Sequence, residues 1–260
     1  MTGAGLLVAH SPFSLALGGT QSRKKLGVAL LGLGNYSANL LAPALQHTEH
    51  CELRGIITGT ESKISKWQRK YGIQDSNVYT YDTIDEVANN KDIDVIYVVT
   101  PTGTHKDFAV KAANTGKHVW CEKPMAMNSD ECQAIIDACN KNGVTLSIGY
   151  RMQHEPNTRT FHHYLESMPY GKFKKVSSFA GYAGQGRDAS NWRMQQHMGG
   201  GALYDMGVYA INSARFLTGK EPLSVTGSHP PQRFPNKFTE VDETTMFTMD
   251  FGNGLMADCG

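Results

Sequence analysis

Residues 26–37 read Leu-Gly-Val-Ala-Leu-Leu-Gly-Leu-Gly-Asn-Tyr-Ser, and the order of these residues decides the fold. The apolar run 26–31 is typical of a buried parallel strand, and the segment 37–48 after the glycines has helical character. Gly32 permits a tight turn, and Gly34 lets the backbone approach a pyrophosphate at the helix N-terminus. The stretch predicts a dinucleotide site rather than a glycine turn without a ligand, with contacts from Gly32, Leu33, Gly34, Asn35 and Tyr36.

Strand and helix patterns alternate through the first 150 residues. Apart from the first pair, we expect strands at 51–58, 94–100, 118–121 and 144–149, and helices at 62–71, 82–89, 105–115 and 129–142. This alternation is typical of a doubly wound parallel sheet with helices on both faces. The sequence therefore predicts an α/β fold in which residues 25–150 form a Rossmann dinucleotide-binding domain.

The rhythm changes after residue 151. Helices are expected at 157–167 and 202–217, and strands at 174–180, 223–228 and 244–251. This order predicts an α+β substrate and oligomerisation domain over residues 151–260, with a mostly antiparallel sheet. Because the chain stops soon after a strand-turn-strand signal at 251–254, we expect this second domain to be incomplete.

The first 24 residues need a separate interpretation. They are mildly apolar, but Ser11 and Pro12 interrupt the apolar run and no Lys or Arg precedes Arg23. The positively charged start of a secretory signal is therefore missing. We expect a flexible N-terminal arm or a misplaced start, with a degenerate export signal as the alternative.

Composition excludes several classes of function. The 260 residues carry 25 Lys+Arg against 24 Asp+Glu, a net charge of +1, which argues against a nucleic-acid partner. Apolar residues make up 40% of the chain, so it can form a core. No apolar run approaches the roughly 18 residues that a membrane span needs. The sequence predicts a protein without a nucleic-acid or membrane partner.

The five cysteines, Cys51, Cys121, Cys132, Cys139 and Cys259, show no C-x-x-C spacing. We interpret them as reduced thiols of a cytoplasmic protein rather than as a disulfide framework or a zinc site. No metal site is predicted.

The end of the second expected strand bears on the choice of cofactor. An Asp or Glu there would bind a ribose 2′-hydroxyl and repel a 2′-phosphate, but the sequence continues Thr58-Gly59-Thr60-Glu61-Ser62-Lys63. Hydroxyls and an ammonium suit a phosphate, so NADP is favoured over NAD. Glu61 is a contrary sign, and the alternative is that these residues only cap the next helix.

Several motifs in order resemble the Gfo/Idh/MocA oxidoreductase family. They are Pro101-Thr-Gly-Thr-His105, Glu122-Lys123-Pro124, Gly149-Tyr-Arg151, Trp192-Arg193 and Gly199-Gly-Gly-Ala-Leu-Tyr-Asp205-Met-Gly-Val-Tyr209. The resemblance covers residue 25 to the end of the chain. Within the family it is nearest to the glucose–fructose oxidoreductase branch, because Tyr209 stands where many relatives carry His.

The resemblance implies a catalytic set of Lys123, Asp205 and Tyr209. In it Lys123 bonds the substrate hydroxyl, Asp205 orients the substrate, and Tyr209 passes the proton. The residues agree with these roles, because positions 205 and 209 share a helix face and a nearby ammonium would lower the pKa of a tyrosine. Further cofactor contacts are expected from Thr100, Pro101, Thr102, His105, Glu122, Lys123, Arg151, Trp192 and Arg193, with sugar binding or structural ion pairs left open for the two arginines.

The sequence thus predicts an NADP-dependent oxidoreductase that moves a hydride between nicotinamide and a sugar or polyol. Two alternatives remain: a non-catalytic dinucleotide-binding sensor, and an NAD-dependent glycosidase of the same family. The resemblance also implies a homodimer or tetramer that assembles through the second-domain sheet.

Overall fold

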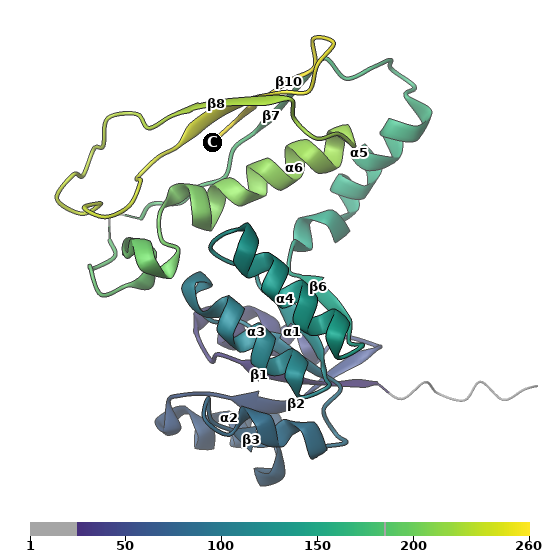
Figure 1. Ribbon diagram of the computed structural model, residues 1–260, viewed down its shortest axis with the longest axis vertical. Helices are drawn as coiled ribbons and strands as arrows, with labels where there is room; N and C mark the ends of the chain where they lie inside the picture. Colours follow the sequence, from purple (N-terminus) through teal and green to yellow (C-terminus); the bar gives the residue numbers. More distant parts are fainter. Residues whose placement is uncertain (1–24, 185) are drawn as a thin grey trace, which may run out of the picture.

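A computed structural model describes residues 25–184 and 186–260, which form two sheet-and-helix units (Figure 1). The first unit holds a six-stranded sheet in the order β3-β2-β1-β4-β5-β6, with every described pair parallel. Its strands are β1 (Leu26–Leu31), β2 (Cys51–Ile57), β3 (Val78–Tyr79), β4 (Val95–Val98), β5 (His118–Cys121) and β6 (Leu146–Ile148). The prediction of a doubly wound parallel sheet is confirmed.

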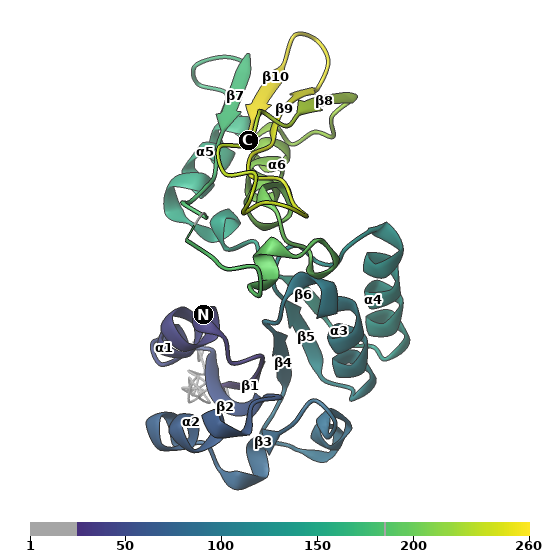
Figure 2. The ribbon, with the colours of Figure 1, turned by 90° about the vertical axis from the view of Figure 1, so that its left-hand side faces the viewer.

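Helices cover both faces of this sheet. Figure 2 shows α1 (Ala42–Leu45) and α2 (Ile64–Tyr71) on one side, and α3 (His105–Asn114) and α4 (Ser129–Lys141) on the other. Strand β1 shows why both faces need cover: Val28 and Leu30 belong to one apolar cluster, whereas Ala29 and Leu31 belong to the opposite one. Because successive side chains of a strand point to opposite faces, an unbroken apolar run requires helices on each side.

The second unit is built on a four-stranded sheet in the order β7-β10-β9-β8. Its strands are β7 (Lys175–Ser178), β8 (Ser224–Ser228), β9 (Met246–Asp250) and β10 (Met256–Cys259). Strands β7 and β10 pair in parallel, and the other two pairs are antiparallel. The expectation of a mostly antiparallel second sheet is confirmed.

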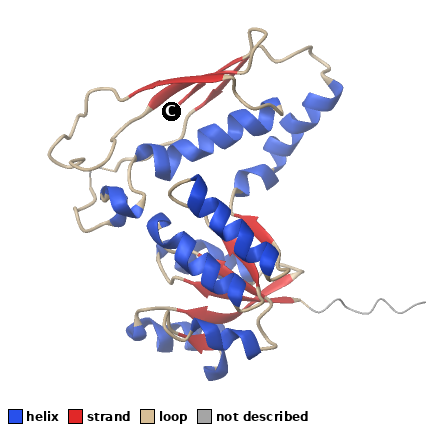
Figure 3. Ribbon diagram, viewed as in Figure 1, coloured by secondary structure: helices blue, strands red, loops and turns tan. Residues whose placement is uncertain are grey.

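Helices α5 (Pro156–Ser167) and α6 (Val208–Thr218) lie between this sheet and the first unit (Figures 1 and 3). Ala210 and Ala214 of α6 are fully buried and pack with Phe247 and Met249 of β9. These small side chains let α6 lie close to the sheet, so the residues on its other faces are available to the first unit.

The helical segments lie close to their expected positions, but several are of another helix type than expected. The helix expected at 37–48 starts as the π-helix η1 (Ser37–Leu41), and the one expected at 202–217 starts as the π-helix η9 (Leu203–Gly207). The two-residue strand β3 was not predicted, because two residues carry no periodic pattern. Short 3₁₀ turns occupy η2 (Glu61–Lys63), η3 (Asp75–Asn77), η4 (Ile84–Asn89), η5 (Thr102–Thr104), η6 (Arg151–His154), η7 (Trp192–Met194) and η8 (Gln196–Met198).

Three expectations concern location, assembly and the N-terminal residues. Within the described ranges, every helix is too short or too polar to cross a bilayer. The flexible arm expected over residues 1–24 lies outside the described residues. The cytoplasmic location and the assembly through the second sheet stay predictions.

Candidate functional site

The glycine-rich turn after β1 has the geometry of a phosphate-binding loop. Gly32 has φ of +98°, and a Cβ there would lie 2.8 Å from the carbonyl oxygen of Val99, so only glycine fits. The Ser37 hydroxyl donates a 2.5 Å hydrogen bond to the Gly32 carbonyl and closes the turn. Among the described residues, nothing beyond its chain neighbours lies within 4 Å of a Cβ built on Gly34. The turn therefore leaves open space at a helix N-terminus, as a pyrophosphate requires.

The residues after β2 lie beside this turn, although they do not all face outward. Lys63 reaches back and donates from its ammonium to the carbonyl oxygen of Leu33 at 3.0 Å. Thr58 is only 2% exposed, and its hydroxyl accepts a bond from the backbone N–H of Thr60, so it shapes the turn. Gly59 packs against the ring of Tyr81, which the sequence reasoning did not identify. Of this group, Lys63 is the residue that brings a positive charge to the glycine turn.

The structure brings Lys123, Asp205 and Tyr209 together across the two units. Lys123 follows β5, Asp205 lies in η9, and Tyr209 lies in the first turn of α6. The Lys123 ammonium donates to the backbone carbonyl of Asp205 at 2.5 Å and lies 3.5 Å from carboxylate oxygen Oδ1. It also lies 4.6 Å from the centre of the Tyr209 ring. These contacts place the three residues in one cluster at the carboxyl edge of the parallel sheet, where doubly wound folds bind ligands.

The Asp205 carboxylate is the centre of this cluster. Its side chain is 7% exposed, and Oδ2 accepts hydrogen bonds from Arg193 Nε and from the Tyr182 hydroxyl, both at 2.7 Å. Burial raises the pKa of Asp205, but the charges of Arg193 and Lys123 outweigh burial and hold it below its ordinary value. For Lys123, burial lowers the pKa of the ammonium, and Asp205 opposes that shift. The carboxylate is thus ionised and helps to keep Lys123 protonated.

The sequence predicts that the Lys123 ammonium lowers the pKa of Tyr209, and this prediction is wrong. Burial is the main influence and raises the pKa of the Tyr209 hydroxyl, with Glu122 and Asp205 adding to the rise. The Lys123 ammonium lies over the ring rather than beside the hydroxyl. The cation that opposes the rise is Arg151 of η6, which is hydrogen-bonded to Tyr209. Arg151, rather than Lys123, is therefore the cation that favours the Tyr209 phenolate.

Tyr36 and Glu122 complete the surroundings of Tyr209. Glu122 is 8% exposed, accepts a 2.5 Å hydrogen bond from the Tyr97 hydroxyl, and has its pKa raised by burial. Burial and the charge of Glu122 raise the pKa of Tyr36 to about 12, and Tyr209 and Arg151 also act on it. Groups from the glycine turn, from the end of β5, from η6 and from α6 therefore converge on one place.

The His105 side chain does not face the surroundings of Tyr209. It is 1% exposed, and its two ring nitrogens lie 2.8 Å from the carbonyl oxygens of Thr100 and Pro124. Both nitrogens are occupied, so the side chain offers none to a cofactor. It ties the loop after β4, which includes Pro101, to the loop after β5, and it positions the Lys123 segment.

Of the remaining predicted contacts, Thr102 is 2% exposed and packs against Gly199. Asn35 bonds Asn39 on the first helical turn. Trp192 lies under the guanidinium of Arg193, whose carbon is 4.3 Å from a ring centre. Arg193 forms an ion pair with the carboxylate of Asp205, which agrees with the structural role among its predicted alternatives.

A glycine-rich segment of the second unit sets the distance between the two units. A Cβ on Gly103 would lie 2.5 Å from the carbonyl oxygen of His197, so the two backbones touch there. Nearby, the Tyr204 hydroxyl donates to the carbonyl of Met127 at 2.8 Å. Asp242 accepts a 2.8 Å bond from the backbone N–H of Leu203 and so holds the start of η9. The sequence reasoning missed Asp242 and Tyr204, and the run of glycines at 199–201 was the signal of a close approach.

A cavity of 260 Å³ opens beside Tyr209. Its polar walls include Arg151, Ser178, Asn212 and Ser213, and its apolar walls include Met152, Phe179, Met206 and Phe216. A larger cavity of 840 Å³ lies next to it on the side of Tyr182 and Arg193. The larger cavity borders Tyr182 and Arg193, the hydrogen-bond partners of Asp205, and the smaller one borders Tyr209. A ligand in these cavities can therefore reach the cluster.

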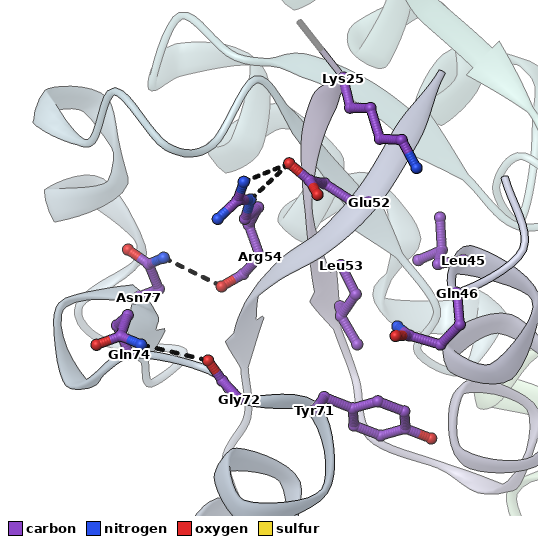
Figure 4. A pocket seen from close by; sticks show the side chains of 10 residues that line it. All are labelled: Lys25, Leu45, Gln46, Glu52, Leu53, Arg54, Tyr71, Gly72, Gln74 and Asn77. Atoms are coloured by element: carbon purple, nitrogen blue, oxygen red, sulfur yellow. Dashed lines mark hydrogen bonds and ion pairs between the residues drawn. The ribbon is translucent and has the colours of Figure 1, made fainter. Parts of the chain in front are cut away.

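A third pocket, of 270 Å³, lies at the start of β2, away from the glycine turn (Figure 4). Its polar walls include Lys25, Glu52 and Arg54, and the Arg54 guanidinium points to Glu52 rather than into open space (Figure 4). No residue predicted for the site lines it. In the described ranges no group of three or more His, Cys, Asp or Glu side chains is arranged to hold a metal ion, and all five cysteines are free.

The geometry defines a Rossmann-type dinucleotide-binding protein with a polar cluster between two units. Comparison with known families agrees. Residues 26–150 match the oxidoreductase family with an NAD-binding Rossmann fold, GFO_IDH_MocA, and residues 158–260 match the GFO/IDH/MocA C-terminal domain. The chain belongs to the Gfo/Idh/MocA oxidoreductase family.

Among solved structures, the aldose-aldose oxidoreductase of Caulobacter crescentus is similar, with a TM-score of 0.85 and 36% identity over 91% of this chain and 70% of that one. Among curated proteins, the D-xylose 1-dehydrogenase [NADP(+)] of Haloarcula marismortui is 26% identical over 89% of this chain and 64% of its own length. The D-xylose 1-dehydrogenase (NADP(+)) 2 of Haloferax volcanii is 29% identical over 73% of this chain and 56% of its own length. The chain thus spans less than two thirds of these two relatives.

Proposed function

We propose that this chain acts as an NADP-dependent oxidoreductase that moves a hydride between nicotinamide and a carbon of a sugar or polyol. The observation that carries the proposal is the cluster of Lys123, Asp205 and Tyr209 at the carboxyl edge of a dinucleotide-binding sheet. The relatives named as xylose dehydrogenases and as an aldose-aldose oxidoreductase support sugars as the substrate class. Tyr209 supports the glucose–fructose oxidoreductase branch.

The residues fit a nicotinamide dinucleotide. The glycine turn leaves open space at Gly34, and the backbone N–H groups of the first helical turn are the donors that a pyrophosphate needs. The Lys63 ammonium, next to Leu33, favours NADP because it can pair with the 2′-phosphate, whereas the negative charge of Glu61 disfavours that phosphate. The relatives support both choices, since two are named for NADP and a levoglucosan dehydrogenase of the same fold was solved with NADH.

The bound dinucleotide would supply the hydride chemistry, and the chain's own residues would handle the proton. Burial keeps the Tyr209 hydroxyl protonated at neutral pH, which suits donation of a proton to a carbonyl oxygen. In the opposite direction the Tyr209 phenolate accepts the proton of the substrate hydroxyl, and Arg151 stabilises that charge. The Lys123 ammonium lies over the Tyr209 ring, and Asp205 holds it there.

The 260 Å³ cavity beside Tyr209 is our proposed sugar site. Its volume is slightly below the range of about 300–1,000 Å³ that is usual for ligand pockets, which suits a ligand as small as a single sugar ring. Hydroxyl and amide groups of Ser178, Asn212 and Ser213 can bond sugar hydroxyls, and the rings of Phe179 and Phe216 can pack on the apolar face of a pyranose.

The test is an assay of NADP reduction with a panel of aldoses and polyols, together with a titration of NADP. Turnover of an aldose with NADP supports the proposal. Tight NADP binding without turnover of any sugar or polyol contradicts it and favours the sensor. Release of a sugar from a glycoside without net reduction of the cofactor contradicts it and favours the glycosidase.

A further inference from the structure

Tyr182 contacts the catalytic cluster although no motif pointed to it. It lies four residues after β7, and its hydroxyl donates a 2.7 Å hydrogen bond to Oδ2 of Asp205. The same oxygen accepts the bond from Arg193 Nε, while Oδ1 lies 3.5 Å from the Lys123 ammonium. Each oxygen of the carboxylate therefore has its own set of partners.

This division fixes the orientation of the carboxylate. A rotation of about a quarter turn about the bond to Cβ would carry Oδ2 away from both of its donors and Oδ1 away from the Lys123 ammonium. Arg193 is held by stacking on Trp192, and the Tyr182 ring lies 4.9 Å from the Arg187 guanidinium carbon. Two anchored donors on Oδ2 therefore turn Oδ1 toward Lys123.

The charged and titratable groups around Asp205 come from four places. Lys123 approaches from the segment after β5, Arg193 from η7, Tyr182 from the segment after β7, and Tyr209 from α6. Burial and the bond to Asp205 raise the pKa of Tyr182 to about 12, so it remains a donor across the neutral range. A donor to an ionised carboxylate stabilises the charged form, so loss of the Tyr182 hydroxyl should raise the pKa of Asp205.

We propose that Tyr182 is a positioning residue that fixes the Asp205 carboxylate against Lys123. Its hydroxyl is assigned no contact with substrate or cofactor, and it acts only through Asp205. The kinetic consequence rests on the proposed function, whereas the effect on the carboxylate does not. Tyr182 is 47% exposed, so Tyr182→Phe keeps the ring and removes one bond without opening a buried cavity.

Tyr204→Phe is the matched control. It deletes a tyrosine hydroxyl that also bonds one acceptor, the Met127 carbonyl, but does not contact Asp205. The first measurement is a carboxyl-carbon NMR titration of the whole chain, with the Asp205 signal identified by its loss in Asp205→Asn. We expect the pKa of Asp205 to rise in Tyr182→Phe and to stay unchanged in Tyr204→Phe.

The second measurement is the pH dependence of kcat for sugar oxidation with NADP. Tyr182→Phe should lower kcat roughly 5- to 20-fold with NADP affinity retained, and the additional loss of rate that protonation of Asp205 causes at acid pH should begin at a higher pH. An unchanged Asp205 titration, or an equal change in Tyr204→Phe, overturns the proposal. If the parent protein oxidises no sugar, the proposed function fails and the NMR titration alone decides the role of Tyr182.

Discussion

The two sides of the candidate site are built by different means. On the first side, Glu122 and Lys123 follow directly on β5, a strand with a parallel neighbour on each side, the mostly buried β4 and the partly exposed β6. On the second side, Tyr182 lies in an irregular segment, Arg193 lies in the 3₁₀ turn η7, and Asp205 lies in a π-helix. A buried sheet positions the first set, whereas hydrogen bonds to side chains such as Asp242 position the second. The first side is therefore a rigid frame, and the second side depends on a few specific contacts.

The largest effect should come from Tyr209, the residue that the second side presents to the first. Tyr209→Phe keeps the ring under the Lys123 ammonium and deletes the hydroxyl. Turnover should fall roughly 10²- to 10⁴-fold, the usual contribution of general acid–base catalysis, with NADP affinity nearly unchanged. Steady-state kinetics on the best sugar measure the effect. A variant as fast as the parent would mean that the proton moves through another group.

The pH dependence should distinguish the two directions of the reaction. Because burial raises the pKa of Tyr209 above its ordinary value, only a small fraction is phenolate at neutral pH. Sugar oxidation needs the phenolate, so its rate should rise up to about tenfold per pH unit below that pKa, while reduction should stay level. Initial rates in both directions between pH 6 and 9 measure this. Equal slopes in both directions would contradict the role of Tyr209.

Two glycine substitutions test whether the sides are separable. Gly32 and Gly201 have φ of +98° and +101°, and a Cβ would meet the Val99 carbonyl at the first and the Asp242 carboxylate at the second. Each change to Ala should cost about 1–3 kcal/mol of stability from backbone strain, measurable as a lower Tm. Gly32→Ala should also weaken NADP binding. Gly201→Ala should lower turnover and leave NADP binding unchanged. Loss of NADP binding in Gly201→Ala would show that the two sides are coupled.

The smallest effect concerns cofactor choice. Lys63→Ala should weaken NADP binding about tenfold and leave NAD binding nearly unchanged, because an exposed ammonium near a phosphate contributes on the order of 1 kcal/mol. Fluorescence titration of both cofactors measures the ratio. Lys66→Ala, which changes an exposed lysine of α2 one turn further on, is the matched control. If Lys63→Ala weakens both cofactors equally, Lys63 only supports the glycine turn through Leu33.

The first side could be predicted from the sequence because its rules are local. An apolar run followed by Gly-x-Gly gives a strand and a turn, and Lys123 after β5 must lie at the carboxyl edge of a parallel sheet. His105 shows the limit of this reasoning. Its place near the site was predictable, but its burial between two carbonyl oxygens depends on how two loops meet.

The second side could be predicted only in part. The spacing of Asp205 and Tyr209 placed them on one helix face, and the resemblance supplied their link to Lys123. Spacing could not show that the ammonium lies over the ring of Tyr209 while Arg151 lies at its hydroxyl. Tyr182 was invisible because its contact with Asp205 joins segments 23 residues apart through an irregular path.

The central claim is that Tyr209 and Lys123 serve hydride transfer from a sugar carbon, and isotope transfer tests it most directly. The parent protein is incubated with NADP and with glucose or xylose deuterated at C1. The molecular mass of the recovered NADPH is then measured by mass spectrometry. The account predicts NADPH that carries one deuterium from the sugar, and almost none formed by Tyr209→Phe in the same time. NADPH without deuterium, or equal deuterium transfer by Tyr209→Phe, would contradict it.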